Sequence, residues 1–88
     1  MKWSIELAVD VQRQFRKFDP QVVRRLRSAL RVIATLDDPR SKGKPLTGTL
    51  RGLWRYRVGD YRIICDIRDA ELIIVAVAVG HRRDVYAD

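Results

Sequence analysis

LWRYRVGDYRII, from Leu53 to Ile64, places two runs rich in aromatic and β-branched residues on either side of a Gly-Asp pair. Such runs favour β-strands, and a glycine at the first position of a two-residue loop is typical of a type II′ turn. The stretch therefore predicts an antiparallel hairpin, with strands over 53–58 and 61–68 joined by Gly59-Asp60.

A two-residue turn also fixes the pairing, and side chains alternate between the two faces of a strand. Arg57 is then expected opposite Arg62, and Arg55 opposite Ile64. One face is apolar and is expected to meet helices: Trp54, Tyr56, Val58, Tyr61, Ile63, Cys65 and Ile67. The other face is polar: Arg55, Arg57, Arg62, Asp66 and Arg68.

The arginines at adjoining positions predict a preorganised anion-binding site. Like charges directly opposite on a sheet are destabilising, although exposure to solvent screens them. The alternative is an ordinary polar face with Asp66 as partial counter-ion. We favour phosphate binding, because the chain carries 18 Lys and Arg against 11 Asp and Glu, a net charge of +7. Arginine also offers a planar fork of donors that suits phosphate.

The remaining segments predict a single domain over residues 1–88. Alternating residues at 2–7 predict a strand, and apolar residues at helical spacing predict helices over 8–18 and 20–36. The second helix starts with Asp19 as N-cap and Pro20 at its first position. Its inward residues are expected to be Val22, Val23, Leu26, Leu30, Val32 and Ile33, and its arginines are expected on a solvated face: Arg24, Arg25, Arg27 and Arg31.

Residues 37–52 are rich in Pro, Gly and Asp and predict a long connecting loop with a turn near Pro45, and residues 71–79 predict an apolar inner strand. The predicted order is β-α-α-β-β-β. We therefore expect an α+β fold, a small antiparallel-dominated sheet with two N-terminal helices packed on one face.

Composition excludes several classes of protein. A single cysteine, Cys65, rules out an internal disulfide, and with the single histidine it leaves no set of ligands for a structural zinc ion. The apolar run 72–79 is too short to span a bilayer, and residues 1–10 contain acidic residues too early for a signal peptide. We expect a cytoplasmic protein without metal or cofactor, a polyanionic partner and no membrane association.

The hairpin and the C-terminal segment together resemble a known family. LWRYRVGDYRIICDI, the apolar strand, VGHRRDVY and the approach KPLTGTLRGLWRYR resemble the RelE branch of the RelE/ParE toxin superfamily over nearly the whole chain. The resemblance implies a RelE-like, microbial ribonuclease-type fold and the toxin of a type II toxin–antitoxin system. It also implies a metal-independent endoribonuclease (an mRNA interferase), which cleaves mRNA in the ribosomal A site and inhibits translation. An antitoxin encoded beside the toxin, expected to be acidic, would be its protein partner.

By position, the resemblance places the catalytic set at Arg55, Arg57, Arg62, Arg82 and Tyr86. Well-known members carry lysines where this chain has Arg55 and Arg57, and arginine effectively cannot lose its proton. Histidine changes its charge near neutral pH, so His81 becomes the candidate general base or acid.

Two other functions remain open. The ParE branch shares the fold and poisons DNA gyrase, although the arginine cluster and Tyr86 favour the RelE branch. A catalytically inactive homologue could instead bind RNA or an antitoxin without chemistry, because fold does not fix function.

Overall fold

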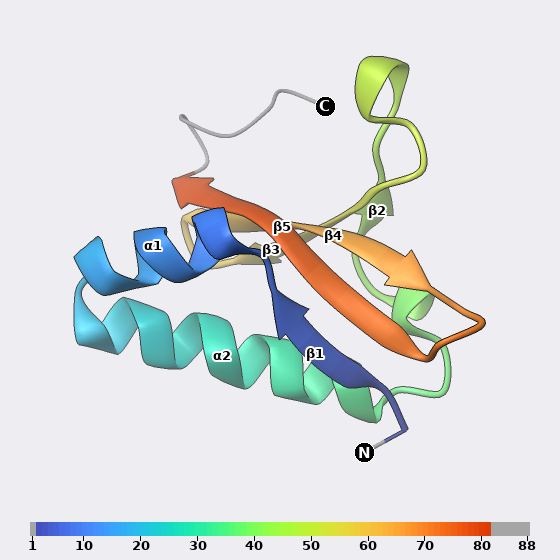
Figure 1. The fold of residues 1–88 in the computed structure, drawn as a ribbon, viewed down its shortest axis with the longest axis horizontal. Coiled ribbons are helices and arrows are strands. Elements are labelled where there is room, and N and C mark those ends of the chain that lie inside the picture. Colours follow the sequence, from blue (N-terminus) through green and yellow to red (C-terminus); the bar gives the residue numbers. More distant parts are fainter. Residues whose placement is uncertain (1, 82–88) are drawn as a thin grey trace.

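The computed structural model describes residues 2–81, in which two helices lie against one face of a five-stranded sheet (Figure 1). The sheet order is β1-β5-β4-β3-β2, with β1 parallel to β5 and every other pair antiparallel. The elements are β1 (Ser4–Leu7), α1 (Val9–Lys17), α2 (Pro20–Thr35), β2 (Lys44–Pro45), β3 (Trp54–Val58), β4 (Tyr61–Arg68) and β5 (Ile73–His81). The α+β prediction is confirmed, and the sheet is mixed but dominated by antiparallel pairs.

The predicted loop over 37–52 contains a strand that the sequence pattern did not show. Pro45 lies in β2, opposite Trp54, rather than in a turn. Because β2 has only two residues, it is too short to produce a periodic pattern of apolar side chains. Two short 3₁₀ turns flank it, at Pro39–Ser41 and Gly48–Leu50.

The start of α2 follows the predicted capping signal. The Asp19 carboxylate accepts a hydrogen bond of 2.8 Å from the Gln21 N–H, and Pro20 opens α2. Leu26 and Leu30 are buried on the inner face of α2 as predicted, but Val32 is 60% exposed. The prediction for Val32 was wrong because Ile33, its neighbour in the chain, is the residue that turns toward the core.

The hairpin has the predicted register, with Arg57 opposite Arg62 and Tyr56 opposite Ile63. Gly59 has a φ of 59°, the left-handed value that a type II′ turn requires at that position. The last strand starts and ends two residues later than predicted, so that it includes His81. The register between β4 and β5 shifts between Ile64 and Cys65, which indicates a β-bulge.

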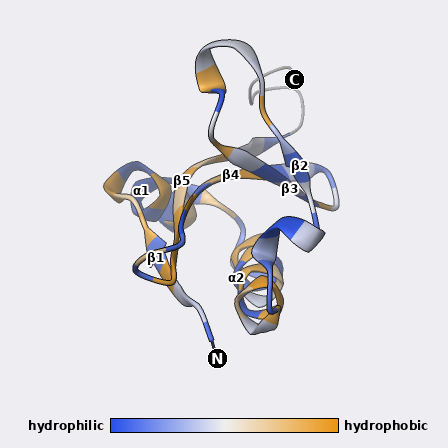
Figure 2. Cartoon of the chain, turned by 90° about the vertical axis from the view of Figure 1, so that its right-hand side faces the viewer, coloured by the Kyte–Doolittle hydropathy of each residue, from blue (hydrophilic) through white to orange (hydrophobic). Residues whose placement is uncertain are grey.

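The core lies between the helices and the sheet. In Figure 2, seen from the side, the sheet forms one layer, α2 lies beneath it, and hydrophobic segments of both face the space between them. The central residues include Val11 and Leu26 from the helices and Ile63, Cys65 and Ile74 from the sheet. None of the helices found within residues 2–81 is long and apolar enough to cross a membrane.

Candidate phosphate-binding site

The predicted arginine face forms on the side of the sheet away from the helices. Arg57 lies opposite Arg62, and Arg55 lies opposite Ile64. The three arginines differ in exposure: Arg57 is exposed, Arg62 is half-buried, and Arg55 is only 5% exposed. Their shared face is therefore confirmed, but the expectation that all three face solvent is wrong for Arg55.

Burial around Arg55 gives the physical reason. Its cross-strand neighbour Ile64 is 1% exposed, so this part of the outer face is covered rather than open to water. A covered side chain has fewer accessible rotamers, which fixes the position of the Arg55 guanidinium. An incoming anion would contact Arg57 and Arg62 first, and the Arg55 guanidinium beside them is already held in place.

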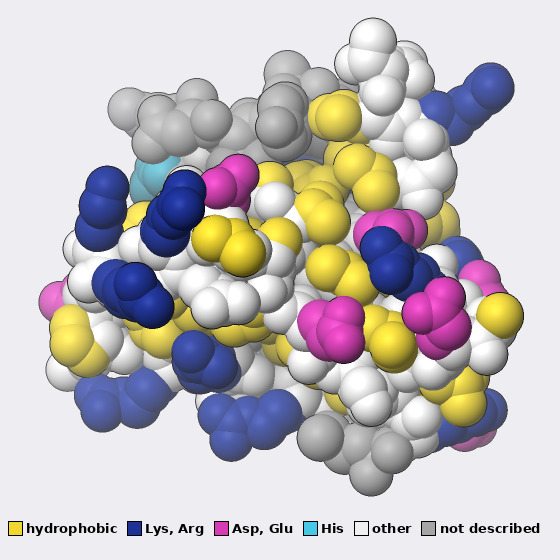
Figure 3. Space-filling view, in the orientation of Figure 1, with side chains coloured by type: hydrophobic (Ala, Val, Ile, Leu, Met, Phe, Trp, Pro, Cys, Tyr) yellow, Lys and Arg dark blue, Asp and Glu magenta, His cyan; other side chains and the backbone are white. Residues whose placement is uncertain are grey.

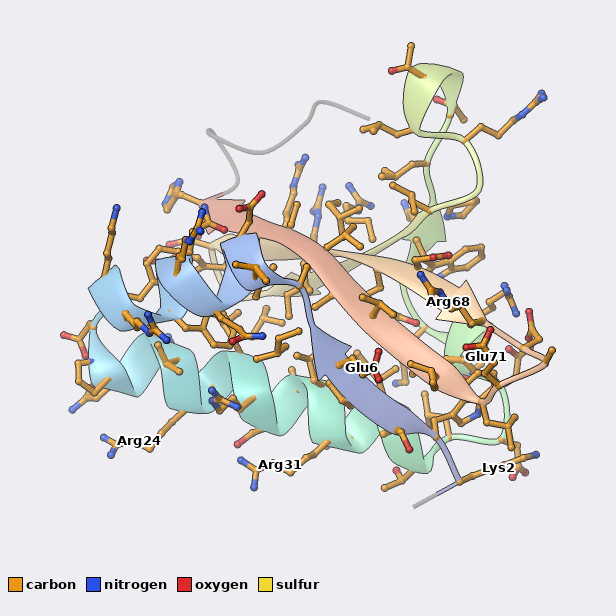
Figure 4. The ribbon with its side chains drawn as sticks, viewed as in Figure 1. Lys2, Glu6, Arg24, Arg31, Arg68 and Glu71 are labelled. Carbon is orange, nitrogen blue, oxygen red and sulfur yellow. The ribbon has the colours of Figure 1, made fainter. Side chains whose placement is uncertain are left out.

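Asp66 does not act as the counter-ion of this cluster. Its carboxylate pairs with Arg68, with 3.2 Å between Arg68 Nε and Asp66 Oδ2. Asp66 lies four positions after Arg62 along β4, a span of about 13 Å in a strand. Figure 4 shows Arg68 with Glu6 and Glu71 toward the same end of the molecule. The space-filling view in Figure 3 likewise shows acidic side chains gathered there, away from the helices where many Lys and Arg side chains lie.

His81 occupies the end of β5, opposite Tyr61. Its ring meets the Tyr61 ring edge-on, with 5.7 Å between centroids, and Tyr61 in turn lies 5.5 Å from the Phe18 ring on the helix side. The register thus places His81 on the face opposite the arginines, although the preceding Gly80 is the partner of Arg62. The structure does not bring His81 onto the arginine face, and Arg82 and Tyr86 lie outside the described residues.

Two buried groups near the site have structural roles. Burial raises the pKa of the Tyr56 hydroxyl above its ordinary value, and this hydroxyl donates a hydrogen bond of 2.7 Å to the Pro39 carbonyl. Burial also raises the pKa of the Cys65 thiol to about 12, so that the thiolate is scarce at neutral pH. Neither side chain is suited to proton transfer or nucleophilic attack.

Lys44 is a site residue that the sequence reasoning missed. It pairs with Arg55 across β2 and β3, and residues directly opposite in an antiparallel pair share a face. Lys42, Lys44, Arg55 and Arg57 also line one pocket of about 510 Å³ between α2 and the β2–β3 edge. The closely spaced lysines of KGK, residues 42–44, are the signal that could have found this second basic element.

The helix arginines differ in their distance from the hairpin, because Arg25 lines a pocket together with Val58 of β3. Arg24 and Arg31 point away from the fold on the outer side of α2 in Figure 4, as predicted for a solvated face. Within residues 2–81, no group of three His, Cys, Asp or Glu side chains is placed to hold a metal ion.

Comparisons with known proteins cover nearly the whole chain. Residues 4–86 match the family described as ParE toxin of type II toxin–antitoxin system, parDE. Toxin RelG of Mycobacterium tuberculosis is 29% identical over 89 residues, 98% of each chain. In the M. tuberculosis toxin–antitoxin complex RelBE2, one chain is 28% identical with a TM-score of 0.74, over 96% of this chain and 95% of that one.

An archaeal structure extends the likeness at the level of the fold. A chain of the RelE–RelB complex from Pyrococcus horikoshii OT3 has a TM-score of 0.74 at 21% identity, over 97% of this chain and 100% of that one. The two solved structures thus share the fold of this chain.

Proposed function

The chain belongs to the ParE toxin family of type II toxin–antitoxin systems and is a RelE-like toxin of the RelE/ParE superfamily, and we propose that it inhibits translation by cutting mRNA in the ribosomal A site. The observation that carries this proposal is the opposition of Arg57 and Arg62 beside the buried Arg55. Adjoining guanidinium groups on one face can share a single anion, and a phosphodiester fits the planar donor forks of arginine.

The proposed reaction needs no metal. The 2′-oxygen of one ribose attacks the adjacent phosphorus, the bond from phosphorus to the 5′-oxygen breaks, and a 2′,3′-cyclic phosphate remains. A base takes the proton from the 2′-OH and an acid supplies one to the leaving 5′-oxygen. Arg57 and Arg62 would stabilise the negative charge that grows on the phosphorane, the role in which fixed cations contribute most.

Proton transfer must come from other groups, because arginine stays protonated. We propose His81 for this step because an imidazole, unlike a guanidinium, can give up a proton. Its ring packs against Tyr61 on the face opposite the arginines, so this role requires the ribose to reach it past the end of β5. Arg82 and Tyr86 complete the proposed set. His81→Ala is expected to abolish cleavage while RNA binding survives, and undiminished cleavage by this variant would remove His81 from the mechanism.

The activity is tested on translating ribosomes, with message ends mapped by primer extension. Wild-type protein is expected to give breaks in phase with codons, and Arg57→Gln with Arg62→Gln is expected to reduce their rate by about 100-fold or more, the loss typical of removing a transition-state charge stabiliser. Arg31→Gln is the matched control, because Arg31 is exposed on the outer side of α2.

The same experiment separates the alternatives. Intact message together with gyrase-linked DNA breaks would identify a ParE-type activity, which the ParE description of the matching family favours. Intact message and intact DNA would identify a binder without chemistry.

We also propose an antitoxin partner, encoded beside this chain. The RelBE2 structure that this chain resembles is a toxin–antitoxin complex, and a net charge of +7 favours an acidic binding segment. Co-expression with the neighbouring reading frame is expected to restore growth and to yield a complex on gel filtration.

A further inference from the structure

The segment from Asp37 to Lys42 is fixed to the fold by aromatic side chains. Trp3 Nε1 donates to the Asp37 carbonyl at 3.5 Å, Tyr56 Oη to the Pro39 carbonyl at 2.7 Å, and Trp54 Nε1 to the Lys42 carbonyl at 2.6 Å. Loop carbonyls are usually left to water, so side-chain donors at three of them indicate a segment held in one conformation.

An ion pair and a close backbone contact add to this attachment. Both guanidinium nitrogens Nη1 and Nη2 of Arg40 lie 2.8 Å from the Asp69 carboxylate, in a bidentate pair that joins the segment to the β4–β5 turn. Gly43 has a φ of 75°, and a Cβ there would overlap the Arg55 carbonyl oxygen and lie 2.8 Å from Trp54 Nε1. Glycine is therefore what allows the segment to press against β3.

The consequence of this attachment is the placement of two exposed lysines. Lys42 and Lys44 flank Gly43, and both line the pocket that Arg55 and Arg57 also line. Residues directly opposite across an antiparallel pair have Cβ atoms about 5 Å apart, so Lys44 adjoins the Arg55 position. None of the described residues that line this pocket is acidic.

We propose that Lys42 and Lys44 form a second phosphate subsite, which holds the RNA backbone next to the phosphate engaged by Arg57 and Arg62. This inference rests on the proposed RNA cleavage and extends it to a segment outside the hairpin. Lysines suit this role because a flexible point charge can follow a backbone phosphate without fixing its geometry, whereas the arginine forks hold the reacting one.

The apolar side of the same pocket raises the alternative of a protein ligand. Ala29, Ile33 and the exposed Val32 line it from α2. We favour RNA because Lys44 lies directly opposite Arg55, so its charge adjoins those of the arginine face, and Lys42 precedes it by two residues. Docking of an acidic peptide is kept as an outcome of the test.

The first test measures the salt dependence of RNA binding. The probe is a single-stranded 2′-O-methyl oligoribonucleotide, which lacks the attacking hydroxyl and is not cleaved. Each phosphate contact contributes about 0.7 to the slope of log K against log salt for single strands, so Lys42→Gln with Lys44→Gln is expected to lower the slope by about 1.4. The control is Lys2→Gln with Lys17→Gln, which removes the same charge from exposed positions elsewhere.

The second test moves the lysines without removing charge. Gly43→Ala is expected to displace the segment and weaken RNA binding. Gly48→Ala is the matched control, since Gly48 has a similar φ of 65° but a Cβ there meets nothing within 4 Å. Urea unfolding of both variants shows whether they are folded. If Gly43→Ala does not fold, the salt dependence of the Lys42/Lys44 variant still tests the subsite.

The outcomes separate the subsite from the function on which it rests. A slope that falls no more in the Lys42/Lys44 variant than in the Lys2/Lys17 control overturns the subsite while leaving RNA binding by the arginines intact. Loss of antitoxin affinity with unchanged RNA binding also overturns it and assigns the pocket to a peptide. Absence of codon-phased cleavage by the wild-type protein overturns the proposed function itself, whatever the slopes.

Discussion

At the scale of single residues, β3 uses its two faces for different tasks. Arg55 and Arg57 carry positive charge to the outer face, whereas Trp54 and Tyr56 face the helices and donate hydrogen bonds to the segment that precedes β2. One strand therefore both carries the proposed site and holds the neighbouring lysines beside it. A substitution on the inner face is therefore expected to affect the site by displacing its charged side chains, and not by changing their charge.

Tyr56→Phe tests this at a single hydroxyl. Removing it leaves the Pro39 carbonyl without its buried donor, and an unsatisfied buried polar group costs about 1–3 kcal/mol. We expect a decrease of that size in the free energy of unfolding, measured by urea titration. The half-buried Tyr61→Phe gives the baseline for losing a tyrosine hydroxyl on this face; equal losses in the two variants would contradict the assigned role of the bond.

At the scale of elements, the Arg40–Asp69 pair joins the 3₁₀ turn at Pro39–Ser41 to the β4–β5 turn. Both side chains are largely exposed, at 37% and 65%, so the pair is screened by solvent and its contribution is small. The pair matters because it attaches the segment that carries Lys42 and Lys44 to the β4–β5 turn.

The same pair predicts a pH dependence. The hydrogen bond from Arg40 lowers the pKa of Asp69. A carboxylate with a lowered folded-state pKa stabilises the fold above its unfolded-state pKa of about 3.9, and this contribution is lost as pH falls through the folded-state pKa. Asp69→Asn should therefore lower the urea midpoint at pH 7, and the difference in midpoint from wild type should close as the pH falls through the lowered folded-state pKa of Asp69. High salt should reduce the difference in urea midpoint at pH 7. A difference that does not change with pH would exclude the ion pair as its cause.

At the scale of the whole molecule, a small domain depends on one core between two layers. Chains of this size bury roughly 60–65% of the surface that the unfolded chain exposes, and total stabilities are about 5–15 kcal/mol. Each buried residue at the helix–sheet interface therefore contributes a large fraction of the free energy of unfolding of the fold that positions the arginine face.

Leu26→Ala measures this dependence. Leu26 is 0% exposed in the core cluster, and truncating a buried leucine costs about 2–5 kcal/mol. We expect urea titration to show a reduction in the free energy of unfolding within that range. We also expect the variant to lose toxicity at elevated growth temperature while it is still toxic at low temperature. The exposed Val32→Ala is the comparison on the same helix; a similar cost for both would contradict the observed packing.

The local features of this protein follow from the sequence because they depend on neighbouring residues. Asp19-Pro20 sets the start of α2, and Gly59-Asp60 sets the turn and hence the opposition of Arg57 and Arg62. Period and turn type fix which side chains share a face, so the arginine cluster could be predicted without coordinates.

The burial of Arg55, the strand at Lys44–Pro45, and the side of the sheet on which His81 lies were decided by tertiary structure. The physical reason is that each depends on a partner distant in the chain. Burial depends on what covers a face, a two-residue strand depends on the edge that it joins, and the orientation of His81 depends on the register set by a bulge in the β4–β5 pair. Sequence by itself determined which charges stand together, and the assembled sheet decided which of them solvent can reach.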